Sequence, residues 1–428
     1  MKRLLSFIFL VILPPLFAED QLTVQKAFEA ALRRSESYAI REEEIKAAEG
    51  RYYQALGTVL PHLTASGSEI VQDTSGLDLG GDAFSSSFVR KSRPEVAITL
   101  TQPLFQGFRE FKALSASRAD RKKTELEVKR ARQLLFAEVA QLFLLTRELE
   151  EESSILISQK GVLERRIVEL GGRIRLGKSR NSELLSAKSQ DSLLEAEIAR
   201  VQGQRSVAGE TLNFLTGLSG EQKLALPEDP ISPLESLENY LVRGGNRPDR
   251  TASQFAVQLS EAKLVSERAH YFPSLNLEAN YYPYRVGFQD AIDWDLLFTL
   301  QFPLFEGGNS WGLVKEAKAR LKQAELAESE SGRRVELEIR EAYHNLETSR
   351  NEVLALEKAE QNASKNYEAQ NREYRSGLVN NLEVLQSLRE WHEIRRQANR
   401  GRHRALLNAY RLKLAMGELP IELSKEHP

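Results

Sequence analysis

Two long stretches of this sequence repeat each other at a constant offset of 200 residues. Residues 99–107 (TLTQPLFQG) align with residues 299–307 (TLQFPLFEG), and further along Gly177 aligns with Gly377. The offset stays the same up to position 417, where the last of the aligned residues lies. A repeat of this period is longer than the units of solenoid proteins, which span about 20–50 residues. The sequence therefore predicts a chain built from two similar structural halves.

Composition sets the boundaries of these halves. The segment 226–233 (LPEDPISP) contains three prolines in eight residues, and a helix cannot continue through it. We therefore predict five parts, in chain order: a signal peptide (1–18), a first structural repeat (19–220), a proline-rich linker (221–233), a second structural repeat (234–420) and a C-terminal tail (421–428).

The first 18 residues (MKRLLSFIFLVILPPLFA) have the layout of a secretory signal. Lys2 and Arg3 precede an apolar run, two prolines break that run, and Ala18 is a small residue suited to cleavage. The apolar run is too short for a membrane-spanning helix, which needs about 20 residues. Because the chain contains no cysteine, we also expect no lipid on an N-terminal Cys.

Each half shows the same order of predicted elements. A helical stretch (21–58 or 235–270) precedes two short strands, and a very long helical stretch (107–175 or 307–375) follows them. A glycine and a shorter, returning helical stretch complete the half. In the first half, leucines recur every seven residues along the long stretch, which is the pattern of a coiled-coil seam. These residues are Leu135, Leu142, Leu149, Leu156, Leu163 and Leu170.

Helix lengths indicate how these stretches pack. The long stretch, with roughly 69 residues, reaches about 100 Å at 1.5 Å per residue, and the opening and returning stretches each reach about half of that. Two short helices stacked end to end therefore match one long helix, and the unit forms a tall wall without a globular core. We predict a mostly α fold with a small β part, in which a duplicated protomer of long coiled-coil helices lines a tunnel.

Four short segments alternate between apolar and polar residues, as strands with one apolar face do. Strands of about ten residues with aromatic ends fit an outer-membrane β-barrel, and a soluble β-sandwich is the alternative. Four strands cannot close a membrane barrel, because about eight are the minimum. We therefore predict a homotrimer whose protomers together form a 12-stranded transmembrane β-barrel. The aromatic residues near the strand ends are Tyr271, Phe272, Tyr281, Tyr282, Tyr284, Trp294, Phe302 and Phe305.

Several of these features together resemble the outer-membrane efflux protein family of TolC-like channel-tunnels. They are the signal, the duplication, the Pro-Leu-Phe-(Gln/Glu)-Gly junction at 103–107 and 303–307, and the Gly-x5-(Asp/Glu)-x-Leu pattern that starts at Gly177 and Gly377. The resemblance covers nearly the whole mature chain. It implies a trimeric exit duct of a tripartite efflux or type I secretion system in the outer membrane, with a large periplasmic portion. The implied partners are outer-membrane lipid, a periplasmic adaptor and an inner-membrane transporter.

The same resemblance implies roles for residues in the two segments that follow the long helices. Glu183 and Glu383 match acidic positions that face the pore, whereas a second acidic position is Gln386 here. Three copies of each glutamate would form negative rings that attract cations. Ser182 and Tyr374 match positions in the contacts that close the periplasmic end.

The implied adaptor-docking positions lie in the same two segments, which form the predicted tips of the helical hairpins. They are Gly177, Gly377, Leu378, Val379 and Asn380. The family's usual basic residue of the closing contact would lie at Val379, so this part of the contact differs in the present sequence.

A purely structural interpretation of these tips stays open. A glycine after a heptad run is a common helix C-cap, and Ser182, Asn380 or Asn381 suit the N-caps of the returning helices. The two glutamates would then lie in first helical turns, where a carboxylate favours the helix dipole.

Other apparent motifs are rejected. Residues 172–179 (GRIRLGKS) match a P-loop pattern, but they lie inside a heptad run instead of after a buried strand. His392 and His403 are not at metal-ligand spacing, so solvated or packing roles are expected for them. The balance of 59 basic and 61 acidic residues lacks the basic field of nucleic-acid binders. We predict no enzyme activity, cofactor, metal or nucleic-acid partner, and the alternative function is an exported non-channel coiled-coil scaffold or adaptor.

Overall fold

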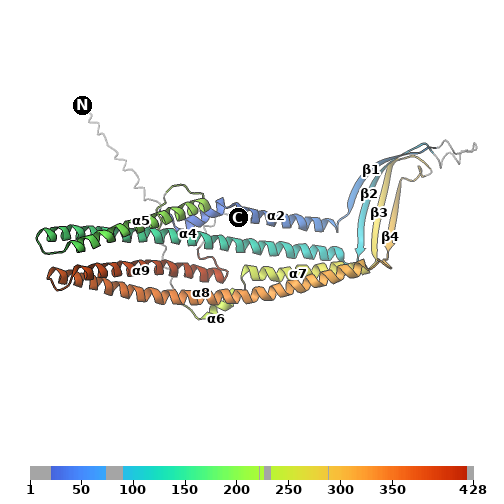
Figure 1. Ribbon diagram of the computed structural model, residues 1–428. Coiled ribbons are helices and arrows are strands. Elements are labelled where there is room, and N and C mark those ends of the chain that lie inside the picture. The colour runs from blue at the N-terminus through green and yellow to red at the C-terminus, as the bar shows by residue number, and fades with distance from the viewer. Residues whose placement is uncertain (1–20, 74–89, 221, 226–232, 288, 422–428) are drawn as a thin grey trace, which may run out of the picture.

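The computed structural model describes residues 21–73, 90–220, 222–225, 233–287 and 289–421. The predicted signal peptide, most of the proline-rich linker and nearly all of the C-terminal tail lie outside the described residues. Within them, four long or medium helices form two hairpins, shorter helices extend these hairpins, and one sheet lies at the far end (Figure 1).

The two hairpins have nearly identical dimensions. In the first, α4 (Arg109–Arg175) has 67 residues and α5 (Asn181–Thr216) has 36. In the second, α8 (Asn309–Arg375) has 67 residues and α9 (Asn381–Ala415) has 35. The hairpins lie side by side with both turns at the same end of the molecule (Figure 1). Among the described residues, no helix is both long and apolar enough to cross a membrane.

Short helices complete the wall between the hairpins and the sheet. The first half contributes α1 (Val24–Arg34) and α2 (Glu36–Gly57), and the second contributes α6 (Leu237–Gly244) and α7 (Pro248–Arg268), which the short η1 (Ala269–Tyr271) extends. Figure 1 shows α2 beside the sheet-proximal half of α4 and α7 beside that of α8. The stacking of short helices along a long one, predicted from length, is therefore confirmed.

The opening helical stretch of the first half is divided, in contrast to the single stretch predicted. Ser35 ends α1, and its hydroxyl accepts a hydrogen bond from the Tyr38 backbone N–H at 3.2 Å to cap α2. In the second half the corresponding break lies between α6 and α7, just before Pro248.

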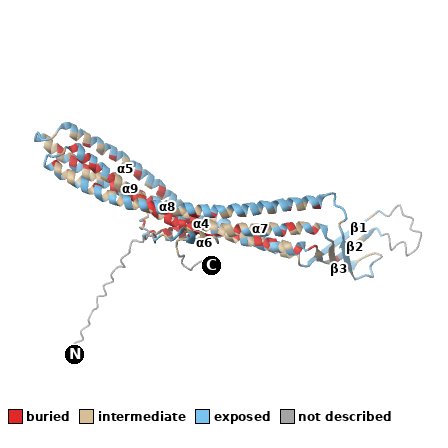
Figure 2. Cartoon of the chain, turned by 90° about the horizontal axis from the view of Figure 1, so that it is seen from below, coloured by how far each residue is buried: buried red, intermediate tan, exposed pale blue. Residues whose placement is uncertain are grey.

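Four of the six residues of the predicted leucine seam lie between α4 and α5, whereas Leu135 and Leu142 belong to an apolar cluster midway along the molecule. Side chains of α4 every seven residues are buried against small and apolar side chains of α5, so that the tip half of the hairpin has a continuous apolar core. The α4 residues are Leu149, Leu156, Leu163 and Leu170, and the α5 residues are Ala187, Leu194, Val201 and Ala208. Buried residues accordingly form a stripe along the hairpins (Figure 2).

A second apolar cluster lies midway along the molecule. Phe136 of α4 contacts Phe28 of α1 and Tyr410 of α9 edge to face, with ring centroids 5.2 and 5.6 Å apart. Both distances are within the range that aromatic pairs favour. This cluster joins elements of the two repeats.

One four-stranded antiparallel sheet combines the strands of both halves in the order β1 (His62–Val71), β2 (Ser92–Gln106), β3 (Ser274–Arg285) and β4 (Trp294–Gln301). The register places polar side chains on one face, where the Thr99 hydroxyl donates to Asn280 at 2.7 Å. The opposite face carries exposed apolar side chains such as Phe298 and Leu300, which are 61% and 70% exposed. The described residues contain no second sheet, so the β-sandwich alternative is wrong.

The strand-to-helix junction of the first half needs a sharp turn. Gly107 and Phe108 both adopt the left-handed conformation, with φ of 63° and 66°. A Cβ on Gly107 would lie 2.9 Å from the Ala269 carbonyl oxygen, so only glycine fits there. The repeated Pro-Leu-Phe-(Gln/Glu)-Gly motif thus turns the chain from the sheet into α4.

Candidate functional site at the hairpin tips

Both hairpin turns are closed by the same glycine-dependent C-cap. Gly177 and Gly377 have φ of 69° and 78°, and the next residues bond back to the helix, Lys178 N to Arg173 O at 2.8 Å and Leu378 N to Glu373 O at 2.9 Å. These bonds define a Schellman motif, which satisfies carbonyl groups at the helix end. The predicted C-cap role of both glycines is confirmed, and Leu378 is left 77% exposed.

The N-caps of the returning helices differ between the two tips. Asn380 caps α9, because its side chain accepts from the Glu383 backbone N–H at 3.2 Å and donates to the Glu383 carboxylate at 2.7 Å. In α5 the cap position is Arg180, without a side-chain bond, and Ser182 is the second helical residue. The N-cap interpretation is therefore confirmed for Asn380 and wrong for Ser182 and Asn381.

The two glutamates occupy the first turns of α5 and α9, where a carboxylate favours the helix dipole. Glu183 is half-buried and accepts a hydrogen bond from the Ser179 hydroxyl at 2.8 Å. Glu383 is exposed and bonded to Asn380. The tips thus present one partly covered and one open carboxylate.

Tyr374 is buried at the tip, 6% exposed, and lies close to two arginines of α4. The Arg166 and Arg173 guanidinium carbons lie 3.8 and 4.4 Å from its ring centroid, distances suited to cation–π attraction. Ser182 is exposed, and no hydrogen bond joins it to Tyr374 in the described part of the chain. These two predicted closing residues are therefore not hydrogen-bonded to each other within the described protomer.

Sequence reasoning missed Arg166. Its side chain is buried, and its Nε donates to Asn381 Oδ1 of α9 at 2.8 Å. Val379, the position where a basic residue was expected, is instead half-buried against the apolar cluster that includes Tyr374 and Leu385. A cation does hold the two hairpins together at the tips, but α4 supplies it.

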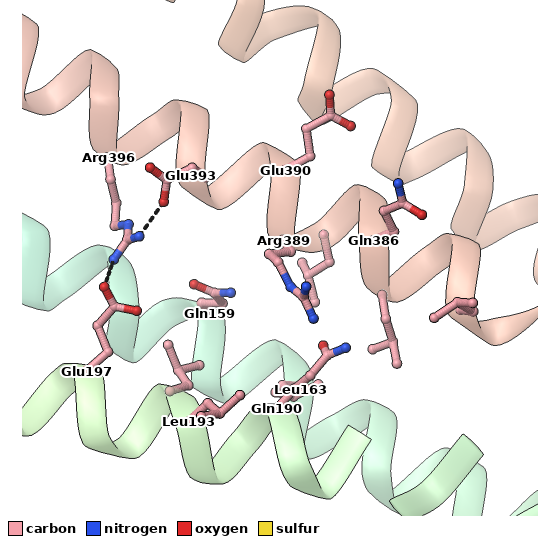
Figure 3. Close-up of a pocket in the computed structure, with 14 residues that line it drawn as sticks. Gln159, Leu163, Gln190, Leu193, Glu197, Gln386, Arg389, Glu390, Glu393 and Arg396 are labelled. Carbon is pink, nitrogen blue, oxygen red and sulfur yellow. Dashed lines mark hydrogen bonds and ion pairs between the residues drawn. The ribbon is translucent and has the colours of Figure 1, made fainter. Parts of the chain in front are cut away.

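Gln386 lines a groove of about 770 Å³ between α5 and α9 (Figure 3). Leu163 and Leu193 lie on its α4–α5 side, and Arg396 closes one end by donating to Glu197 at 2.5 Å. Arg396 also bonds Glu393 of its own helix, so the end of the groove is held by an ionic bridge between the two hairpins. Among the described residues, no group of three potential His, Cys, Asp or Glu metal ligands is present.

Comparison with known proteins places this arrangement in a family. The sequence signature described as "Outer membrane efflux protein" matches residues 27–218 and 244–418, most of the chain and both repeats. The chain belongs to the outer membrane efflux protein family. The proteins of this family that it resembles are outer-membrane channels, so the alternative of a non-channel coiled-coil scaffold or adaptor is wrong.

Individual relatives agree with this assignment over nearly their whole length. The chain is 22% identical to the alkaline protease secretion protein AprF of Pseudomonas aeruginosa, over 98% of this chain and 89% of AprF. Its fold matches CusC with a TM-score of 0.82 at 18% identity, over 94% of this chain and 93% of CusC. It also matches VceC of Vibrio cholerae with a TM-score of 0.80 at 19% identity, over 92% and 96% of the two chains. At these identities the structural matches establish the fold, a helical tunnel wall joined to a small sheet.

Proposed function

We propose that this chain forms a homotrimeric exit duct in the outer membrane, in which three four-stranded sheets form one barrel and the paired hairpins form a periplasmic tunnel. The observation that supports this proposal is the sheet: four strands with one exposed apolar face and one polar face, attached to helical walls about 100 Å long. Four strands cannot enclose a pore, but twelve can. The polar face, with Thr99 and Asn280, would then line the lumen.

Transport would proceed from an inner-membrane transporter and a periplasmic adaptor to the outside. We assign adaptor docking to the tips, where Gly177, Gly377, Val379 and Asn380 shape the turns and Leu378 is exposed. Because AprF is named as an alkaline protease secretion protein, a protein cargo is one candidate, and small molecules are the other.

We also assign the gate to the tips. Glu183 and Glu383, each present three times in a trimer, would form acidic rings, with Gln386 further along α9. Ser182 and Tyr374 would take part in the contacts that close the periplasmic end. Cations would be drawn to such rings and anions hindered, because the charges act at close range.

One experiment tests the duct directly. The full-length protein, purified in detergent, should have the mass of a trimer that dissociates only on heating, and it should form discrete channels in planar lipid bilayers. A monomer or dimer without channel activity would overturn the proposal.

The docking assignment has a separate test. A photoreactive amino acid at position 378 should crosslink a periplasmic adaptor in intact cells, whereas the same group at position 326, on exposed Leu326 of α8, should not. Equal crosslinking from both positions would argue against docking at the tips.

A further inference from the structure

The two hairpin turns share one backbone conformation but present different side chains. Both long helices end at a glycine in the left-handed conformation, and the same pair of backbone hydrogen bonds closes each turn. Because the two repeats are offset by 200 residues, each position of the first turn has a counterpart in the second. Lys178 corresponds to Leu378, and Arg180 corresponds to Asn380. The turns therefore form a matched pair in which the geometry is constant and the chemistry varies.

The turn of the first hairpin is strongly basic. Residues 173–183 contain four basic residues and one acidic residue, which gives a net charge of +3. The corresponding residues 373–383 contain one basic residue and two acidic residues, which gives a net charge of −1. In a trimer, three copies would give +9 at one set of tips and −3 at the other. The two sets of tips therefore differ in the sign of their charge.

The basic side chains of the first turn are available to a partner. Arg175, Lys178 and Arg180 are exposed, and none of the three forms an ion pair within the described residues. Glu183, the one carboxylate among residues 173–183, is half-buried and accepts a hydrogen bond from the Ser179 hydroxyl at 2.8 Å. The positive charge of the turn is therefore not neutralised by its own side chains.

The second turn offers more apolar surface and no such charge. Leu378 and Leu382 are 77% and 63% exposed, and the Glu383 carboxylate is bonded to Asn380. The first turn has one comparable leucine, Leu176, which is 71% exposed. Salt screens attraction between exposed charges, whereas the burial of leucine side chains does not depend on charge. Contacts at the two turns should therefore respond differently to salt.

We infer that the two tips bind a periplasmic adaptor through different chemistry. The first turn binds a segment of the adaptor that carries carboxylates, through Lys178 and Arg180, and the second turn binds an apolar segment. This inference rests on the proposed function, in which the adaptor docks at the tips. Because the hairpins lie side by side, the six tips of a trimer would alternate between the two kinds of contact. Charge complementarity would then fix the rotational register of the adaptor on the trimer.

The second turn supplies the side chains for a test of this inference. Lys178→Leu combined with Arg180→Asn copies the second turn onto the first, in a backbone conformation that both turns share. The probe is a fluorescent helical peptide with four glutamates on one face, and fluorescence anisotropy measures its binding to the full-length trimer in detergent. The wild type should bind this peptide about tenfold more tightly than the double variant. Raising NaCl from about 50 mM to about 500 mM should weaken wild-type binding severalfold.

Two controls separate recognition at the first turn from general attraction to positive charge. Lys358→Leu combined with Lys365→Asn removes the same number of charges from exposed positions of α8 outside the turns, and this variant should retain wild-type binding. The same peptide with glutamines in place of the glutamates should bind the wild type weakly, and salt should not change that binding.

The outcomes separate this inference from the proposed function, because channel formation in planar bilayers is recorded for the same preparations. If the wild type conducts but the double variant at the first turn binds the acidic peptide as the wild type does, the inference is overturned and the duct proposal stands. Equal losses in the α8 control, or wild-type binding that salt does not weaken, would overturn it as well. If the wild type forms no channels, the duct proposal itself fails.

A single substitution covers the case in which the double variant does not assemble. Lys178→Gln removes one charge at an exposed position and leaves Arg180, which precedes α5, unchanged. Weaker binding of the acidic peptide by Lys178→Gln supports the inference, and unchanged binding overturns it.

Discussion

Arg247 forms two parallel hydrogen bonds with Asp249, from Nε to Oδ1 and from Nη2 to Oδ2, each 2.7 Å long. The Arg247 side chain is 1% exposed, and its Nη1 also reaches Glu338 of α8 at 2.5 Å and the Ala415 carbonyl of α9 at 3.3 Å. Arg247 therefore joins the start of α7, the middle of α8 and the end of α9, where the tip half and the sheet half of the second repeat meet.

Replacing Arg247 should destabilise this junction. Arg247→Met leaves two carboxylates without their main partner, and breaking a buried ion pair costs about 3–5 kcal/mol. We expect about 3 kcal/mol, the lower end of that range, because Asp249 and Glu338 side chains stay 33% and 38% exposed. Thermal unfolding of helices, followed by circular dichroism in detergent, measures the change.

Arg334→Met on the same helix wall is the control for that experiment. Arg334 is 64% exposed and pairs with Glu330 one turn away, so its loss should change the stability by no more than about 1 kcal/mol. Equal midpoints for the two variants would show that the Arg247 contacts do not stabilise the junction.

A buried histidine predicts how stability depends on pH. His392 of α9 is 1% exposed, and neither ring nitrogen has a hydrogen-bond partner in the described part of the chain. Burial, with nearby Arg395 and Arg396, lowers the pKa of His392 to about 4. The unfolded chain, with the usual pKa of about 6.5, takes up the proton first as pH falls. The contribution of neutral His392 to the free energy of unfolding should therefore be fully present above about pH 6.5. It should decline by about 3 kcal/mol in total as the pH falls from about 6.5 to about 4.

His392→Leu should remove this part of the pH dependence. Thermal midpoints recorded from pH 7 to pH 4 should fall less steeply for His392→Leu than for the wild type. His344→Leu, which changes a 64% exposed histidine of α8, should keep the wild-type slope. Parallel curves for the wild type and His392→Leu would contradict the assignment of this pH range to His392.

The leucine seam gives a prediction with an adjacent control. Leu156 is fully buried between α4 and α5, so Leu156→Ala should cost about 2–5 kcal/mol through lost burial and a residual cavity. Ile157 is its neighbour and is 53% exposed in the protomer, so Ile157→Ala should cost much less. Denaturant unfolding of the two variants in the same detergent compares them, and similar losses would show that the seven-residue pattern does not identify the core.

Leu156 shows what sequence could predict here. Its burial follows from a pattern of leucines that repeats every seven residues. The leucine seam, together with the lengths of the helices, also predicted that short helices stack along long ones. The duplication of the sequence predicted two hairpins of equal length. The alternation of apolar and polar residues predicted strands with one apolar face. These are local or periodic features, so the sequence carries them directly.

Arg166 shows what sequence could not predict. Arg165 and Arg166 are adjacent and chemically identical, and only the rotation of α4 relative to α8 and α9 decides which one is buried. That rotation depends on tertiary packing. The seven-residue leucine repeat, which pairs α4 with α5, does not determine it. The wrong N-cap role of Ser182 has a similar origin, because α5 begins at Asn181 without any side-chain cap.

The open carboxylate at the second tip supports a prediction about ion block. Because Gln can still accept the 2.7 Å hydrogen bond from Asn380 Nδ2, Glu383→Gln removes the charge and keeps the helix cap. Hexamminecobalt(III), a trivalent cation, should block the wild-type trimer when it is added to the side of the bilayer that faces the tips. It should block the Glu383→Gln trimer with severalfold lower affinity, because that variant loses three negative charges at once. Glu43→Gln removes another exposed charge, from α2, away from the tips, and should retain wild-type block. Unchanged block in Glu383→Gln would place the acidic ring elsewhere, with Glu183→Gln as the next variant to measure.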